Sequence, residues 1–200
     1  IITLMLIIAC TAVIFLKPPP YNNSSELWFL PKDPDLLAFY DMQDKFGDSE
    51  YMAIGIKARP GDKDVFEPET IEMISMISDM LEDHEIVTQV RSLSKYQYTQ
   101  NKNNMLVTDD LFQDIERITE APEALKQARD IIMDEKLALG TIVTADLQHT
   151  RIVARTEYRR NDNQHKVKVV SDLLDFLEEN KFRERGYNIH LAGVQVFGER

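Results

Sequence analysis

Acidic side chains gather at two places in this chain: Asp41, Asp44 and Asp48 around Gly47, and Asp109, Asp110 and Asp114 farther on. The first cluster departs from the D-x-[DN]-x-[DN]-G order that a Ca²⁺-binding loop requires. The second cluster fits a helix start, where carboxylates cap backbone N–H groups and favour the positive end of the helix dipole. We therefore predict a solvated helix face at the first cluster, a helix cap at the second, and a metal site at neither.

Histidine and cysteine give no stronger signal of chemistry. The four histidines, His84, His149, His165 and His190, are scattered, and no two are spaced i, i+4. Zinc needs three or four convergent ligands, which no local motif supplies. The single cysteine, Cys10, lies in an apolar run that disfavours its thiolate, and it excludes an intrachain disulfide.

Sequence motifs of catalysis and nucleotide binding are also missing. The chain contains no G-x-S-x-G, no phosphate-binding G-x-x-x-x-G-K-[ST] and no G-x-G-x-x-G. We find no nucleophile placed beside a base and a group that orients the base. We therefore predict no catalytic, cofactor-binding or metal-binding residue, and a protein that is not an enzyme.

The charge of the chain excludes some partners. Its 200 residues include 34 acidic and 23 basic side chains, for a net charge of −11. Nucleic-acid binding and electrostatic docking on anionic lipid both require a basic surface. The composition is otherwise that of a globular protein, with 44% hydrophobic and 28% charged residues.

Residues 1–16 (IITLMLIIACTAVIFL) are almost entirely apolar. Three interpretations compete: the C-terminal part of a transmembrane helix, the core of a signal peptide, and a buried core helix. A signal peptide would end in a small-x-small cleavage site, but Lys17 and three prolines follow instead. A core helix usually keeps a polar stripe. We favour a transmembrane helix truncated at its N-terminal side, with the prolines forming a stiff exit.

The first half of the remaining chain predicts a helix, a strand, a helix and a strand. Asp33 and Pro34 are typical of a helix start, and Gly47 of a helix end. Residues 51–56 alternate as a strand with Met52, Ile54 and Ile56 on its buried face, and 86–93 form the next strand. Between them a helix from Pro68 carries the stripe Ile71, Ile74, Ile77 and Leu81.

Three methionines, Met73, Met76 and Met80, widen this stripe. Such side chains adapt to varied shapes and could line a groove for apolar ligands. At helical spacing, packing of the helix against a sheet is the better explanation.

The second half predicts a helix, two strands, a helix and a strand. Residues 94–104 read as an exposed loop, and Asp109 and Asp110 as the start of a short helix. Pro122 begins a helix, and 141–146 with 151–158 form a hairpin whose second strand buries Ile152, Ala154 and Thr156. A helix over 167–177 and a strand over 187–194 close the pattern.

The order of several short motifs resembles exporters of the resistance-nodulation-division superfamily, in the region after their first transmembrane helix. The lipid and hydrophobe exporters, with hopanoid-exporter-like and mycobacterial large-membrane-protein-like members, are the most similar branch. The motifs are Leu30-Pro31, Phe46-Gly47-Asp48-Ser49-Glu50, Phe66-x-Pro68-Glu69, Val90-x-Ser92-Leu93, Ile142-Val143-Thr144-x-Asp146 and Ile189-x-Leu191-x-Gly193-Val194. Gln195 stands where relatives often have proline.

The resemblance implies an α+β fold: ferredoxin-like α/β sandwich porter subdomains that follow an N-terminal transmembrane helix. It divides the chain into a transmembrane helix (1–17), a linker (18–26), a first porter part (27–94), a connecting loop and short helix (95–120) and a second porter part (121–200). The implied protein is a proton-driven exporter of hydrophobic or lipid-like substrates. Its proton-relay acids lie in later transmembrane helices, so none is expected here.

The implied partners are the lipid bilayer through residues 1–16, the remaining transmembrane helices and second porter repeat of the full protein, and a lipid-like substrate. Nucleic acid is not among them, and homo-oligomerisation stays open. Residues 21–200 are expected on the periplasmic side of the inner (plasma) membrane. Two alternatives remain: a membrane-anchored extracytoplasmic sensor or binding domain, and an anchored enzyme. Further apolar segments and a second porter repeat after residue 200 would favour the exporter.

Overall fold

The computed structural model describes residues 29–30, 32–46, 49–112, 115, 121–157 and 164–193. The chain divides into two units, residues 1–46 and 47–200. The predicted transmembrane segment and the linker lie outside the described residues. Among the helices that are described, none is both long and apolar enough to cross a bilayer.

The first unit contributes helix α2, Pro34–Phe46. The side chain of Asp33 accepts a hydrogen bond from the N–H of Asp35 at 2.9 Å, so the predicted N-terminal cap is confirmed. Pro34 occupies the first helical position, where its missing N–H costs no hydrogen bond. Gly47, predicted to end this helix, lies outside the described residues.

The second unit is built on an antiparallel sheet that has four strands in the described part of the chain, in the order β2-β5-β1-β6. The strands are β1 (Ser49–Lys57), β2 (Val87–Arg91), β5 (His149–Glu157) and β6 (Asn188–Gly193). Helix α3 (Pro68–Glu82) connects β1 to β2, and α6 (Gln164–Glu179) connects β5 to β6. Since β1 and β2 are both antiparallel to β5 between them, they run in the same direction. Strands from both predicted porter parts thus contribute to one sheet.

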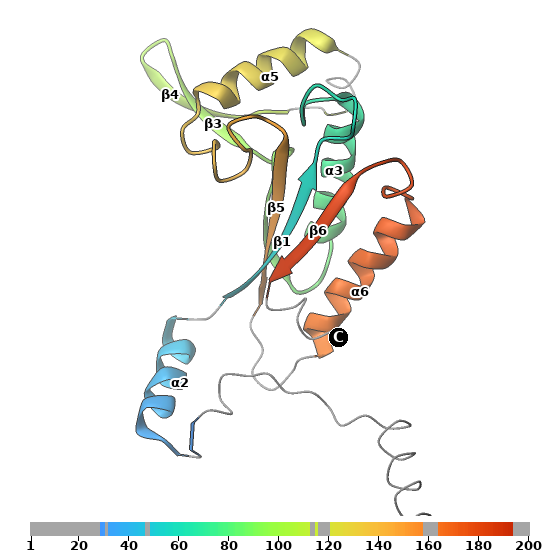
Figure 1. Ribbon diagram of the computed structural model, residues 1–200. Helices are drawn as coiled ribbons and strands as arrows, with labels where there is room; N and C mark the ends of the chain where they lie inside the picture. Colours follow the sequence, from blue (N-terminus) through green and yellow to red (C-terminus); the bar gives the residue numbers. More distant parts are fainter. Residues whose placement is uncertain are drawn as a thin grey trace, which may run out of the picture. The chain divides into compact units, whose positions relative to one another are not determined.

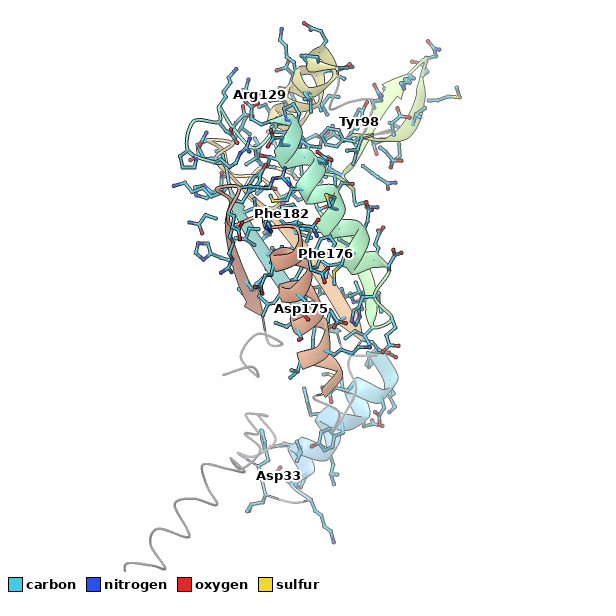
Figure 2. All side chains as sticks on the ribbon, turned by 90° about the vertical axis from the view of Figure 1, so that its right-hand side faces the viewer. Asp33, Tyr98, Arg129, Asp175, Phe176 and Phe182 are labelled. Carbon is cyan, nitrogen blue, oxygen red and sulfur yellow. The ribbon has the colours of Figure 1, made fainter. Side chains whose placement is uncertain are left out.

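The core lies between one face of this sheet and helices α3 and α6. Helix α3 lies behind the sheet in Figure 1, and Figure 2 shows α3 and α6 next to each other on the same side of it. The predicted inward residues of β1, β5 and α3 are all buried: Met52, Ile54, Ile56, Ile152, Ala154, Thr156, Ile71, Ile74, Ile77 and Leu81. From α6, Val169, Val170, Leu173 and Leu177 complete the core. The α+β class predicted from the sequence is therefore observed.

Between β2 and β5 the chain adds a second antiparallel sheet, β3 (Gln97–Lys102) with β4 (Met105–Asp110), and helix α5 (Pro122–Asp134). The predicted loop over 94–104 is wrong, because most of it forms β3. Asn103 and Asn104 make the turn with φ of 54° and 63°, the left-handed pair of a type I′ hairpin. The predicted helix start at Asp109 and Asp110 is also wrong, since both belong to β4.

The predicted hairpin over 141–158 is only half correct. Its second strand is β5, but the first run meets β5 only around Val143, which bridges Thr150. The N–H of Thr144 donates to the His149 carbonyl at 3.0 Å, and the N–H of Arg151 donates to the Ile142 carbonyl at 2.9 Å. The N–H groups of Thr141 and Ile142 donate instead to the Ala138 carbonyl, at 3.2 and 2.8 Å. The pairing goes no further because β2 occupies the same edge of β5 from Val153 to Thr156, while β1 occupies the other edge along its whole length.

Candidate functional site

The residues with metal-binding or catalytic chemistry do not meet in the described part of the chain, where no three His, Cys, Asp or Glu side chains converge. Asp41 instead forms an ion pair with Lys45 at 2.6 Å, and Asp109 one with Lys102 at 2.7 Å. Asp48 and Asp114 lie outside the described residues. The predicted solvated face at Asp41 and Asp44 agrees with the exposure of both side chains.

An open groove of about 1370 Å³ runs along the edge strand β2 of the second unit. One wall is formed by residues of α3, and another by the face of β2 and β5 that carries Arg91, Val153 and Arg155. The loop after β2 and residues around Leu137 and Ile142 complete the lining. Polar and apolar side chains both line it, so the groove suits an amphipathic ligand better than a purely apolar one.

This face of β2 and β5 carries three arginines in the groove. Arg151 and Arg155 are exposed on β5, on either side of Val153. Arg91 on β2 pairs directly with Val153. Residues opposite each other on antiparallel strands share a face, so the three arginines surround Val153 on one surface.

One lysine pairs with two of the carboxylates on the α3 wall. The ammonium of Lys95 lies 2.7 Å from the Asp79 carboxylate and 2.8 Å from that of Glu82. Burial works to lower the pKa of Lys95, but the hydrogen bonds to Asp79 and Glu82 outweigh it, so that the pKa is raised. Lys95 therefore stays charged and holds these two carboxylates.

Three buried hydroxyls lie between α3 and the loop after β2. Ser78 and Ser92 are 2.8 Å apart, Ser92 and Ser94 2.9 Å, and Ser94 and Ser78 3.3 Å. Ser78 also donates to the Ile74 carbonyl at 2.6 Å. A nucleophilic serine needs an adjacent base, but these hydroxyls bond to one another and to the backbone. The triangle is therefore a structural link that fixes β2 against α3.

A second polar cluster fixes the start of β6 to the start of α3. Arg59 bonds Asp62 at 2.9 Å and Glu69 at 2.6 Å, and its guanidinium lies 4.9 Å from the centre of the Tyr187 ring. Burial raises the pKa of Tyr187, whose hydroxyl accepts a weak hydrogen bond from Thr70 at 3.4 Å. Every polar group of this cluster points at another group of the fold, so it has a structural role.

The arginine cluster was only partly visible in the sequence. Alternation along β5 predicts that Arg151 and Arg155 face away from the core, and the structure agrees. The position of Arg91 beside Val153 depends on a strand pairing between residues far apart in the chain, for which the sequence has no local signal.

Neither a comparison with models of known protein families nor a search among curated proteins finds a match to this chain.

Proposed function

We propose that this chain is the extracytoplasmic porter segment of a proton-driven membrane exporter of hydrophobic or lipid-like substrates, with ferredoxin-like subdomain architecture. The observation that carries the proposal is the strand order β2-β5-β1-β6. Two β-α-β units interlock in it, and α3 and α6 both pack on one face. That order of elements is typical of the split β-α-β, or ferredoxin-like, arrangement.

The other sheet face supports the proposal in a second way. It borders the groove, which both apolar and charged side chains line. In this proposal the groove forms part of the path along which an amphipathic substrate moves out of the membrane. The chain itself contributes walls of that path, and the proton-driven motor lies elsewhere in the protein.

A topology experiment tests the membrane placement. In a Cys10→Ser background, Leu106→Cys places one thiol on the hairpin, at a side chain that is 81% exposed. A membrane-impermeant maleimide should label it once the outer membrane is permeabilised while the inner membrane stays sealed. Labelling that requires lysis of the inner membrane would contradict the proposal.

Transport is tested with the complete protein that contains this chain, reconstituted in proteoliposomes. An imposed proton gradient should accelerate movement of a fluorescent lipid analogue, and a protonophore should abolish the effect. A protein that binds the analogue but shows no gradient-dependent movement would instead favour the anchored binding domain.

A further inference from the structure

The groove departs from the charge of the whole protein. In a chain with a net charge of −11, Arg91, Arg151 and Arg155 occupy neighbouring positions on one sheet face. Arginine is the side chain suited to fork-like recognition of phosphate or carboxylate oxygens. A local cationic cluster on an acidic protein attracts an anion to that one place.

The strand register gives the size of the cluster. Arg151 and Arg155 are four residues apart on β5, or about 13 Å at the rise of a β-strand. Arg91 lies one strand away and opposite the midpoint, Val153, which puts its Cα about 8 Å from each of the other two. Nε of Arg151 donates to the Thr141 carbonyl, which fixes one side of that guanidinium on the groove wall. The long side chains can therefore converge on one anionic group above Val153.

Apolar surface lies beside the arginines. Val153 forms the floor, and Ile142 and the exposed Leu137 line the same groove. The volume of about 1370 Å³ exceeds that of a typical small-molecule pocket, about 300–1,000 Å³. An anion with an attached apolar chain would use both kinds of surface.

The centre of the same face is lined by small residues. Gly55 of β1 lies opposite Arg151, and Ala53 lies opposite Val153. A Cβ on Gly55 would meet nothing nearer than 3.8 Å, so packing within the chain does not require glycine there. A glycine in a strand interior is destabilising by about 0.5–1 kcal/mol relative to alanine, and such glycines often mark a place that another molecule or backbone approaches closely.

We propose that the groove binds an anionic amphiphile, with its phosphate or carboxylate head on Arg91, Arg151 and Arg155 and its apolar chain along Val153, Ile142 and Leu137. The inference rests on the proposed function, because it narrows the substrate class from lipid-like molecules to anionic ones. Of the four carboxylates that line the groove, Lys95 holds Asp79 and Glu82, and Asp110 accepts a hydrogen bond from the Gln97 amide at 2.8 Å. The fourth, Glu72, lies on the α3 wall.

The test is equilibrium binding of two fluorescent lipids to the complete purified protein in non-ionic detergent. Labelled phosphatidylglycerol and labelled phosphatidylcholine, with identical acyl chains, differ in head-group charge. We expect the anionic probe to bind at least tenfold more tightly. Equal affinities for the two probes would overturn the proposal.

The matched variants are Arg91→Gln/Arg155→Gln and the control Lys126→Gln/Arg183→Gln. Both remove two positive charges from exposed side chains, but Lys126 and Arg183 do not line the groove. Arg151 is left unchanged because of its bond to Thr141. The groove variant should weaken binding of phosphatidylglycerol at least tenfold, and the control by less than twofold. Equal effects of the two variants would show general charge attraction and overturn the proposal.

Inorganic phosphate distinguishes an amphiphile site from a site for a small anion. At 10 mM it should leave most of the labelled phosphatidylglycerol bound, whereas full displacement would overturn the amphiphile assignment. The binding experiments and the transport assay can fail independently of each other. Gradient-driven export of a neutral lipid, unaffected by the groove variant, would reject this inference and keep the proposed function. Binding that depends on the arginines, without any gradient-driven transport, would keep this inference and reject the proposed function.

Discussion

Oδ2 of Asp64 lies 2.8 Å from Nε of Arg129, and the ion pair ties α5 to the loop that follows β1. The Asp64 side chain is 5% exposed and that of Arg129 29% exposed. Arg129 is labelled beside α5 in Figure 2. Since Oδ1 of Asp64 accepts the Phe66 N–H at 2.9 Å, the carboxylate also shapes the loop in which it lies.

Removing the cation should destabilise the protein because it leaves a buried carboxylate without its counter-charge. We expect Arg129→Met to lower the free energy of unfolding by about 3 kcal/mol, measured by urea denaturation. Asp64→Asn/Arg129→Met should recover part of that loss. Lys126→Met, on the exposed side of α5, is the control and should cost less than about 0.5 kcal/mol. An Arg129→Met protein as stable as the control would refute the role of the pair.

Within the buried hydroxyl triangle, Ser92 makes the two shortest contacts, to Ser78 and to Ser94. Ser92→Ala removes the partner of both Ser78 and Ser94 and should lower the free energy of unfolding by about 1–3 kcal/mol. Ser75→Ala, on the same helix as Ser78 but with a hydrogen bond exposed to solvent, should cost less than about 0.5 kcal/mol. Thermal unfolding of the two variants compares them directly, and equal losses would contradict this assignment.

The hairpin turn offers a stabilising change. Asn104 has a φ of 63° at the second position of the type I′ turn, where glycine is preferred. Asn104→Gly should slow amide exchange in β3 and β4, whereas Asn104→Val should speed it, because a β-branched residue is strained at positive φ. Exchange that is unchanged in both variants would mean that the turn does not limit opening of the hairpin.

Asp109 gives the hairpin a pH dependence. Hydrogen bonds from Lys102 and then Gln100 lower the pKa of this carboxyl below its ordinary value. A lowered pKa in the folded state means that the contact stabilises the hairpin above the pKa of the unfolded chain and is lost as pH falls through the folded pKa. An NMR titration of Asp109 should show the lowered pKa, and Lys102→Met should bring it back up. No difference between the two proteins would contradict the prediction.

A substitution at Gly55 tests whether the stability of the fold requires glycine at this position of the sheet. Gly55→Ala should leave the free energy of unfolding unchanged or raise it by up to about 1 kcal/mol, because the added Cβ has room. A loss of more than about 1 kcal/mol in urea denaturation would mean that glycine is required by the fold itself.

The main helices and strands follow from local patterns in the sequence. The apolar stripe from Ile71 to Leu81 and the apolar alternation in β1 each mark the face of the element that is buried in the core. The β3–β4 hairpin escaped prediction because β3 is polar on both faces apart from Tyr98, and its turn is Asn-Asn rather than Asn-Gly. Thr141 to Asp146 has strand-like composition, but its pairing with β5 stops near Val143 because β2 occupies that edge of β5 from Val153 on. Long-range pairing overrides local preference there.

The candidate site was less predictable than the fold for the same reason. The local sequence around each arginine does not show which other arginines lie near it. Only the pairing of Arg91 with Val153 makes Arg91 a neighbour of Arg151 and Arg155. The groove along β2 likewise depends on how the loop after that strand folds back.

The position of β1 in the sheet governs when this protein can fold. Both of its neighbours, β5 and β6, are synthesised long after it, from His149 onward. A nascent chain that stops before His149 carries Met52, Ile54 and Ile56 with no strand to pair beside them. Such high contact order slows folding, so the unit completes its core only after nearly its whole length has been released. Until then β1 is a hydrophobic segment that a chaperone would have to shield.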